Sequence, residues 1–247
     1  MNEQDRLKIS RQRYRQRREN GLAGWADDKS YERKISNALA LIAKYRAPDN
    51  GRFLELGCGA GNVTIEMARR GFDAYGMDIV PEAVEWAKAN AEKAGVHACF
   101  HAGTVALLQP FQDDFFDVVF DGDCLWMVLG NERPNCFLNV FRVLKPGAVF
   151  FAQAHIVTNT FKERYVIAPG ASIDPVTLLS TVNDTPIYQY SREDAFLSEI
   201  RTAGFEVHHY RTGDLDSRDK DMPPFYKGVM FVDAGKPKRC RGQQSAL

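Results

Sequence analysis

The segment FLELGCGAGNVT at residues 53–64 places glycines at alternate positions directly after a short apolar run. An apolar run that ends in glycines and continues as a helical pattern is typical of a strand that turns tightly into a helix. Because Gly57, Gly59 and Gly61 lack side chains, a ligand can approach the backbone and the free N–H groups of the helix N-terminus. The turn therefore predicts an α/β domain with a nucleotide-like ligand beside it.

Strand and helix patterns alternate on both sides of this turn. Strands that alternate with helices at this spacing form βαβ units and hence a parallel sheet, and continuously apolar strands indicate burial on both faces. The expected strands are 52–56, 73–77, 97–101, 115–120 and 148–154, and the expected helices are 61–70, 81–94 and 132–143.

The last third of the chain breaks this rhythm. Residues 156–190 are polar and are predicted to be irregular, followed by a helix over 191–203 and strands over 205–211 and 226–233. Two consecutive strands without a helix between them must pair antiparallel. The fold expected is a Rossmann-like, seven-stranded, mostly parallel sheet with a terminal antiparallel strand and helices on both faces.

The domain organisation follows from charge and loop length. We predict a basic N-terminal extension over 1–30 that acts as a lid, a main domain over 31–235, and a disordered basic tail over 236–247. Ser30 is predicted to cap the first helix of the main domain. The insert 156–190 is too long for a plain connection and is predicted to cap the acceptor site.

Composition limits the partners and the compartment. Lys plus Arg and Asp plus Glu number 32 each, so no net field attracts nucleic acid or an anionic membrane. The scattered cysteines show no paired spacing, and no histidine pair comes with an acid at metal spacing, so neither a disulfide framework nor a metal site is predicted. Without a secretory signal or an apolar run of membrane-spanning length, the protein is expected to be cytoplasmic.

Spacing separates the ligands that such a glycine turn can hold. A triphosphate loop needs a lysine after its glycines, and none follows here; the dinucleotide fingerprint needs a third glycine where this chain has Asn62. Asp78 ends the second strand, where an acid can accept both hydroxyls of a ribose, and Ile79 follows it in a position to cover a base.

Four segments, LELGCGAGNVT, YGMDIVPEAVEWA, FFDVVFDGD and VFRVLKPGAVFF, stand in the order of one family. Over roughly residues 35–155 the chain resembles the class I S-adenosylmethionine-dependent methyltransferases of the small-molecule type. The resemblance implies S-adenosylmethionine as cofactor, with its methionine part at the glycine turn and adenine beside the segment after the third strand. That segment carries Gly-Asp in the family and Gly103-Thr104 here, so a hydroxyl or a backbone carbonyl substitutes. The predicted cofactor-binding residues are Glu55, Gly57, Cys58, Gly59, Gly61, Asn62, Asp78, Ile79, Gly103, Thr104 and Asp121.

Candidate catalytic residues follow from the position of ligands in open α/β sheets, beyond the carboxyl ends of the strands. That position selects Asp121 and Asp123 after the fourth strand and His155 after the fifth. Either aspartate is a candidate to bind the cofactor's ammonium or to orient an acceptor. His155 is the candidate general base because imidazole titrates near neutrality. We predict His155 and Asp123 as catalytic. The predicted substrate-binding residues are Tyr14, Trp25, Trp126 and His155.

The function expected is methyl transfer to an O, N or S atom of a small molecule by in-line displacement, in which alignment accounts for much of the rate. One alternative is an RNA or protein methyltransferase that uses the basic residues of 1–20. Others are an NAD-dependent oxidoreductase and a cofactor-binding protein without catalysis. The segment DMPPFY at 221–226 is similar to a signature of DNA amino-methylating enzymes, but that signature belongs after the fourth strand. Nucleic acid is therefore not expected as a partner.

Overall fold

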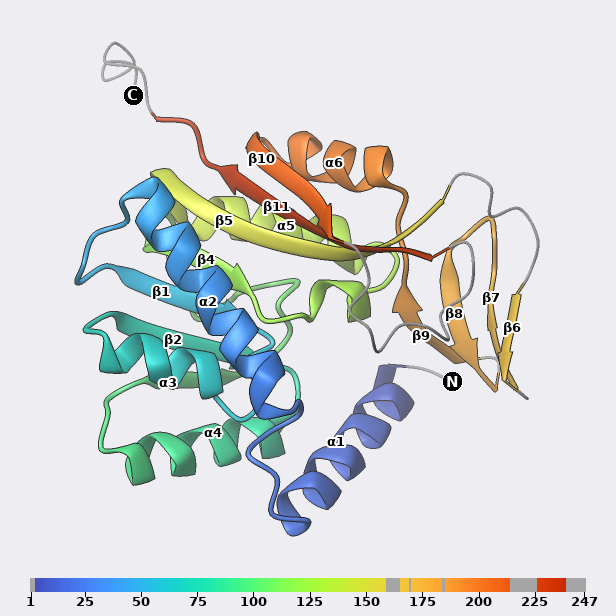
Figure 1. Ribbon diagram of the computed structural model, residues 1–247, viewed down its shortest axis with the longest axis horizontal. Coiled ribbons are helices and arrows are strands. Elements are labelled where there is room, and N and C mark those ends of the chain that lie inside the picture. The colour runs from blue at the N-terminus through green and yellow to red at the C-terminus, as the bar shows by residue number, and fades with distance from the viewer. Residues whose placement is uncertain (1–2, 159–164, 169, 184, 214–225, 239–247) are drawn as a thin grey trace.

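A central sheet of seven strands organises the chain, with the order β10-β11-β5-β4-β1-β2-β3 (Figure 1). The computed structural model describes residues 3–158, 165–168, 170–183, 185–213 and 226–238. Strands β1 to β5 pair in parallel, whereas β11 pairs antiparallel with both β5 and β10. This confirms the predicted seven-stranded, mostly parallel sheet. The strands are β1 (Arg52–Leu56), β2 (Asp73–Asp78), β3 (Cys99–Ala102), β4 (Phe116–Asp121), β5 (Leu144–Val157), β10 (Glu206–Gly213) and β11 (Tyr226–Gly235).

Helices cover both faces of this sheet, as its apolar strands predicted. Side chains alternate between the faces of a strand, so Phe53 packs under one set of helices while Leu54 packs under the other. Helices α2 and α3 cover the face of Phe53, and α5 and α6 cover the face of Leu54. The helices are α1 (Glu3–Glu19), α2 (Asp28–Tyr45), α3 (Asn62–Arg69), α4 (Pro81–Ala94), α5 (Glu132–Val143) and α6 (Glu193–Thr202), with a short 3-10 turn, η1 (Leu125–Met127).

Local signals set several helix ends. Helix α4 begins at Pro81 and ends before Gly95, which adopts φ +66°, as the sequence predicted. The predicted cap of α2 is wrong. The carboxylate of Asp27 accepts from the Ser30 N–H at 2.8 Å, so Asp27 is the cap and Ser30 lies inside the first turn.

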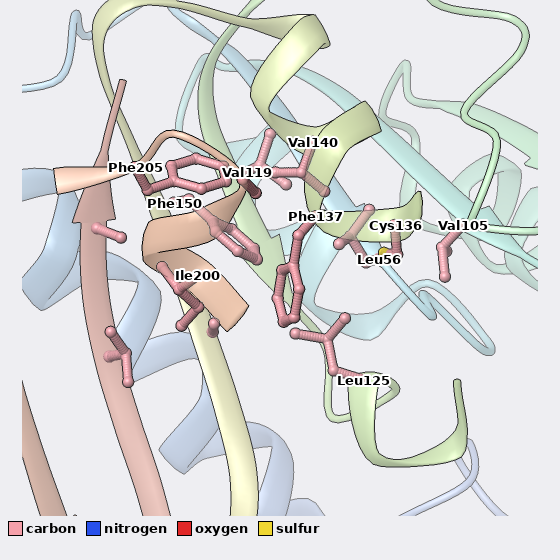
Figure 2. Packing of buried hydrophobic residues seen from close by; sticks show 14 of the residues in the cluster. Leu56, Val105, Val119, Leu125, Cys136, Phe137, Val140, Phe150, Ile200 and Phe205 are labelled. Carbon is pink, nitrogen blue, oxygen red and sulfur yellow. The ribbon is translucent and has the colours of Figure 1, made fainter. Parts of the chain in front are cut away.

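The larger core cluster positions the loop that follows β4 (Figure 2). Phe137 of α5, Phe150 of β5 and Ile200 of α6 are fully buried in it, and Leu125 of η1 packs into the same cluster. Truncating a buried phenylalanine costs about 3–5 kcal/mol in stability. The loop after β4 is therefore anchored by the core and held at one place beside the sheet.

The insert 156–190 is folded, so the prediction of an irregular segment is wrong. It contains a four-stranded antiparallel sheet in the order β6-β7-β8-β9, which we call the cap sheet. Strands this short and rich in Thr and Ser show little hydrophobic alternation, which is why the sequence pattern missed them. The cap sheet lies beyond the ends of the core strands (Figure 1). Its strands are β6 (Tyr165–Ala168), β7 (Ala171–Ile173), β8 (Leu179–Val182) and β9 (Thr185–Gln189).

The insert leaves and rejoins the core at one point. The Val157 N–H donates to the Ser191 carbonyl at 3.0 Å, and the Ser191 N–H donates to the His155 carbonyl at 3.0 Å. Strand β5 extends to Val157, three residues beyond its predicted end, because it continues to pair with β11. This paired stretch brings His155 to the junction between core and cap.

Parts of the predicted organisation fall outside the described residues. Residues 239–247 of the predicted tail and residues 221–225 of the DMPPFY segment lie there. Among the residues that the structure describes, none of the helices is long and apolar enough to span a bilayer.

Candidate cofactor and acceptor site

The glycine turn after β1 presents bare backbone to a cavity. Gly57 and Gly59 adopt φ of +69° and +53°, a region that favours glycine. A Cβ at Gly57 would collide with the side chain of Cys124, and one at Gly59 would lie 3.0 Å from the Tyr14 hydroxyl. The N–H groups of Gly57 and Cys58 both donate to the Met77 carbonyl, at 2.8 and 3.0 Å. The turn is therefore fixed against the end of β2.

Glu55 joins β1 to the helix that follows the turn. Its Oε2 accepts from the Thr64 N–H at 3.0 Å and from the Thr64 hydroxyl at 2.6 Å. Burial raises the pKa of Glu55 to about 7, against the opposing effects of the Thr64 bonds and the Lys34 charge. Glu55 therefore combines a structural bond on one oxygen with a place in the wall of the cavity.

Asp78 is held rigidly at the end of β2. Its Oδ2 accepts from the Gly59 N–H at 2.9 Å and from the Tyr14 hydroxyl at 3.4 Å, and its Oδ1 accepts from the Val80 N–H at 2.9 Å. Burial raises the pKa of Asp78, and these hydrogen bonds oppose that effect. The acid thus stands directly beside the glycine turn, as predicted for a ribose ligand.

A cavity of about 200 Å³ lies among the carboxyl ends of β1, β2 and β4. Most of the residues predicted from sequence meet in its wall. Those in the wall are Tyr14, Trp25, Glu55, Gly57, Cys58, Gly59, Asp78, Ile79, Thr104, Asp123 and Trp126. Residues of the wall that the sequence analysis did not name include Leu7, Arg13, Lys34, Met127, Val128, Glu132, Ile187 and Tyr188.

Several predicted cofactor contacts lie behind the wall. Asp121 is fully buried; its Oδ1 accepts from the N–H groups of Cys124 (2.8 Å) and Leu125 (3.2 Å), and its Oδ2 from that of Gln153 (3.3 Å). The carboxylate thus shapes the loop after β4 instead of facing the cavity. Gly61, Asn62, Gly103 and His155 also stand outside the wall.

Two of these residues fix the wall from behind. Gly61 starts α3 with φ +81°, where a Cβ would press on Ala87 and Phe100 at 3.0 Å. The Asn62 amide donates to the Ala23 carbonyl at 3.3 Å, which ties the N-terminal segment to α3. The predicted ligand residues therefore divide into those that face the cavity and those that hold its shape.

Asp123 projects from a left-handed backbone position. Its φ is +75°, in a region that favours glycine and that aspartate tolerates better than most other residues. The Trp126 indole donates to the Asp123 carbonyl at 3.1 Å, and Lys34 Nζ donates to the Gly122 carbonyl at 2.7 Å. The Asp123 carboxylate lies 3.9 Å from Lys34 Nζ on one side and 3.9 Å from His155 Nε2 on the other.

Trp126 connects the core to the cap sheet. Its ring stacks on Tyr188 of β9, with centroids 4.0 Å apart and planes 10° apart, and contacts the His155 ring at 4.1 Å. Aromatic pairs of this kind contribute about 0.5–1.5 kcal/mol beyond burial. This three-residue set, His155, Trp126 and Tyr188, places part of the cap sheet in the wall of the cavity.

Helix α1 closes the cavity from the other side. Tyr14 contacts the Trp25 ring at 4.9 Å, and Arg17 lies 5.0 Å above the same ring. Arg11 and Arg15 both pair with Glu82 of α4, at 2.8 and 2.7 Å. Several of the arginines in this basic segment therefore contact the protein itself.

The described residues give no support to a metal site or to a cysteine nucleophile. Among the described residues, no group of three His, Cys, Asp or Glu side chains is arranged to hold a metal ion. Burial raises the pKa of the Cys58 and Cys124 thiols well above their usual range, so both stay protonated near neutral pH.

Comparison with known proteins agrees with this geometry. Residues 54–152 match the family described as a methyltransferase domain. The chain is 28% identical over 177 residues to the S-adenosyl-L-methionine-dependent Diels-Alderase iliD of Neonectria sp., covering 70% of this chain and 64% of that protein. It is 30% identical over 114 residues to the ubiquinone biosynthesis O-methyltransferase of Xanthomonas axonopodis pv. citri, covering 46% of each.

A solved structure shows the same architecture over most of the chain. The SAM-dependent methyltransferase of Methanosarcina mazei has a TM-score of 0.62 and 25% identity, covering 81% of this chain and 98% of that one. The alignments with the curated relatives span less than two thirds of the relatives' own length, for example 64% and 44%.

Proposed function

From the premise that this chain belongs to the class I S-adenosylmethionine-dependent methyltransferases, we propose that it methylates an O, N or S atom of a small molecule. One observation carries the proposal. The Asp78 carboxylate accepts from the Gly59 N–H in a cavity that is also lined by residues of α1 and of the cap sheet.

The residues present fit the cofactor. Asp78 offers a fixed carboxylate for the ribose hydroxyls, and the turn at Gly57 and Gly59 leaves the space that side chains would fill. Ile79 and Val80 give an apolar surface for the adenine. When bound, S-adenosylmethionine supplies an electrophilic methyl group on its sulfonium.

The chain's own contribution is alignment and exclusion of water. Positioned reactants save on the order of 7–11 kcal/mol of barrier. Asp123 faces the cavity, whereas His155 lies 3.9 Å behind its carboxylate and outside the wall. We assign Asp123 to contact with the bound molecules and His155 to positioning Asp123, with a proton-accepting role only for an acceptor that must lose a proton.

The shape of the site favours a small acceptor. Met127 and Val128 after β4 and Ile187 and Tyr188 of the cap sheet line the same cavity as Asp78. The rival RNA methyltransferase needs a free basic surface, but Arg11 and Arg15 are paired with Glu82. A roofed cavity with apolar walls suits a small molecule better.

Isothermal titration tests the cofactor half of this proposal. We expect micromolar binding of S-adenosylmethionine and of its demethylated product, and no change in nicotinamide fluorescence when NADH is mixed with the protein. A screen of acceptors that follows release of the demethylated product then tests methyl transfer. Tight NADH binding with no response to S-adenosylmethionine would support the oxidoreductase instead.

A second candidate is a [4+2] cycloaddition with the cofactor retained unchanged. It is favoured by the 28% identity to the Diels-Alderase iliD, together with the position of His155 outside the wall. Such a reaction needs no proton acceptor facing the substrate. The amount of demethylated cofactor released per molecule of product distinguishes the two reactions. Methyl transfer releases one demethylated cofactor per product, whereas a cycloaddition forms product without consuming the cofactor. If a saturating acceptor is bound and neither occurs, the chain is a binding protein.

A further inference from the structure

A second hollow lies beside the main cavity, on the N-terminal helix. We call it the α1 hollow. It has a volume of about 370 Å³ and is lined by side chains from α1 and from the segment that follows it: Arg13, Gln16, Arg17, Asn20, Leu22 and Trp25. Arg13 and Trp25 also line the main cavity. The two spaces therefore share part of their walls.

The chain folds back after α1 to form this hollow. The Leu22 N–H donates to the Arg17 carbonyl at 3.1 Å, and Gly21 adopts φ +71° at the turn. The ring of Trp25 contacts the Tyr14 ring at 4.9 Å and lies 5.0 Å from the Arg17 guanidinium carbon. This ring contact holds the Arg17 guanidinium at the wall of the hollow.

The α1 hollow carries positive charge that the protein does not neutralise. Arg11 and Arg15 both pair with Glu82 on the other side of α1, because residues two apart do not face the same way on a helix. Arg13 and Arg17 are one turn apart, and among the described residues no carboxylate pairs with either of them. The residues that line the hollow include no acid.

The helix dipole accounts for only one of these two charges. Arg17 lies in the last turn of α1, where the negative end of the dipole stabilises a basic residue. Arg13 lies one turn earlier, and the effect of the dipole falls off within the last turn. Gln16 and Asn20 add carboxamide donors to the same wall. The hollow thus offers N–H donors from two arginines and two carboxamides to one ligand.

We propose that the α1 hollow binds an oxyanion, and that this oxyanion is an acidic group of the methyl acceptor. The second half rests on the proposed function. Guanidinium groups bind carboxylate, sulfate and phosphate oxygens through paired hydrogen bonds. The main cavity is less suited to such a group because, apart from Arg13, its wall has one basic residue and four acids: Lys34, Glu55, Asp78, Asp123 and Glu132. The acceptor is therefore oriented with its acidic end against α1 and the rest of the molecule in the cavity.

The first test uses inorganic phosphate as the probe and follows the indole N–H signals by NMR. The chain has three tryptophans. Trp25 lines the hollow, Trp126 lines the main cavity, and Trp86 is buried on α4. Phosphate is titrated against chloride at equal ionic strength. We expect the Trp25 signal alone to shift and to saturate at about millimolar phosphate, the affinity that two charge-assisted hydrogen bonds supply.

Variants of α1 locate the bound phosphate. Arg13→Gln and Arg17→Gln should each weaken phosphate by about tenfold or more, and glutamine keeps the helix because it is a good helix former. Arg18→Gln, at an exposed position outside both spaces, is the matched control and should leave the Trp25 titration unchanged. A response equal to that of chloride, a shift confined to Trp126, or a Trp25 shift that both variants retain would overturn the oxyanion site.

The second test asks whether the oxyanion belongs to the acceptor. Candidate acceptors are screened in pairs, each an acid and its neutral amide, by release of the demethylated cofactor. We expect kcat/KM for the acids to exceed that for the amides by about 10- to 100-fold, and this preference to fall to about threefold or less in Arg13→Gln. Arg18→Gln should keep the preference. Equal kcat/KM for acid and amide in the wild type would overturn the assignment to the acceptor.

Failure of this proposal is distinct from failure of the proposed function. If phosphate shifts the Trp25 signal but S-adenosylmethionine does not bind, the proposed function is wrong and the oxyanion site stands. If the wild type methylates acceptors but Trp25 does not respond to phosphate, the proposed function stands and the oxyanion site is wrong. Binding of an RNA oligonucleotide that Arg18→Gln weakens as much as Arg13→Gln would indicate a continuous basic surface along α1 and would overturn the assignment to a small acceptor.

Discussion

The hydroxyl of Tyr14 on α1 lies 3.4 Å from Oδ2 of Asp78 at the end of β2. Burial, and next the Asp78 charge, raise the pKa of Tyr14 well above its ordinary value, so the hydroxyl remains a donor. The N-terminal helix thus reaches the same carboxylate oxygen that the Gly59 N–H holds. The position of α1 and the geometry of the Asp78 carboxylate are therefore linked through one oxygen atom.

The ring and the hydroxyl of Tyr14 contribute separately to this link. We expect Tyr14→Phe to weaken the demethylated cofactor by about two- to tenfold, because one neutral-to-charged hydrogen bond is lost. Tyr14→Ala should weaken it more, since the packing against Gly59 and Trp25 is also lost. Calorimetric titration measures both. Equal affinity of Tyr14→Ala and wild type would show that α1 does not contribute to cofactor binding.

Replacing Asp78, the proposed ribose-binding acid, is expected to affect every nucleoside alike. We expect Asp78→Asn to weaken S-adenosylmethionine and 5′-methylthioadenosine by about 10- to 100-fold each, because both carry the ribose. Asp73→Asn, at the exposed start of the same strand, is the control. A loss confined to S-adenosylmethionine would place Asp78 at the amino-acid head instead.

The buried Glu55 predicts a pH dependence of stability. The pKa of Glu55 in the folded state is raised from 4.5 to about 7. The stability that the protonated Glu55 carboxyl contributes is therefore fully present below about pH 4.5 and is lost as the pH rises through 7. Glu55→Gln removes this loss. The difference in unfolding free energy, variant minus wild type, should therefore become more positive by about 3 kcal/mol as the pH rises from about 4.5 to 7.

Urea unfolding at several pH values measures this difference. The Asp121 carboxyl, whose pKa burial also raises to about 7, is present in both proteins and cancels. Glu92→Gln, at an exposed position of α4, is the control, and its curve of unfolding free energy against pH should run parallel to that of wild type. A Glu55→Gln curve parallel to that of wild type would show that folding does not raise the pKa of Glu55.

The ring contact between Trp126 and Tyr188 predicts how the cap sheet is attached. Tyr188→Leu removes the stacking and should speed amide hydrogen exchange across β8 and β9, while the affinity for the demethylated cofactor stays within about threefold. Tyr210→Leu, on the exposed edge strand β10, is the control. Unchanged exchange in β9 would mean that the cap is held by other contacts.

The ion pairs of Glu82 predict a salt-sensitive lid. Glu82→Gln loses the pairs with Arg11 and Arg15, and exposed pairs contribute about 0.2–1 kcal/mol. Cofactor dissociation should speed up by about two- to thirtyfold at low salt, because two pairs are lost, and the difference from wild type should vanish at high salt. Stopped-flow displacement measures the rate. Glu85→Gln, whose pair with Lys88 lies within α4, serves for comparison.

Local signals made part of the site predictable from sequence. Gly57 and Gly59 need positive φ and open space, and Asp78 ends a strand at the edge where ligands gather. The residues that meet these requirements are adjacent in the sequence, so a short segment is enough to predict them. Pro81 and Gly95 mark the ends of α4 for the same reason.

The remaining site residues depend on tertiary packing. Asp121 and Asp123 look equivalent in the sequence, and the N–H groups of Cys124 and Leu125 decide which carboxylate turns inward. Lys34 stands on a helix that only the assembled sheet brings to the loop after β4. Tyr188 belongs to a strand whose pattern is too short to identify. No local signal selects these residues.

The departure and return of the cap sheet at Val157 and Ser191 have an evolutionary consequence. Because the two ends are joined to each other by backbone hydrogen bonds, a different segment can be spliced between them with little effect on the half of the fold that holds the nucleoside. Under the proposed function, in which the cap sheet lines the acceptor side of the cavity, acceptor choice can diverge by exchange of this one segment, under selection separate from that on the glycine turn.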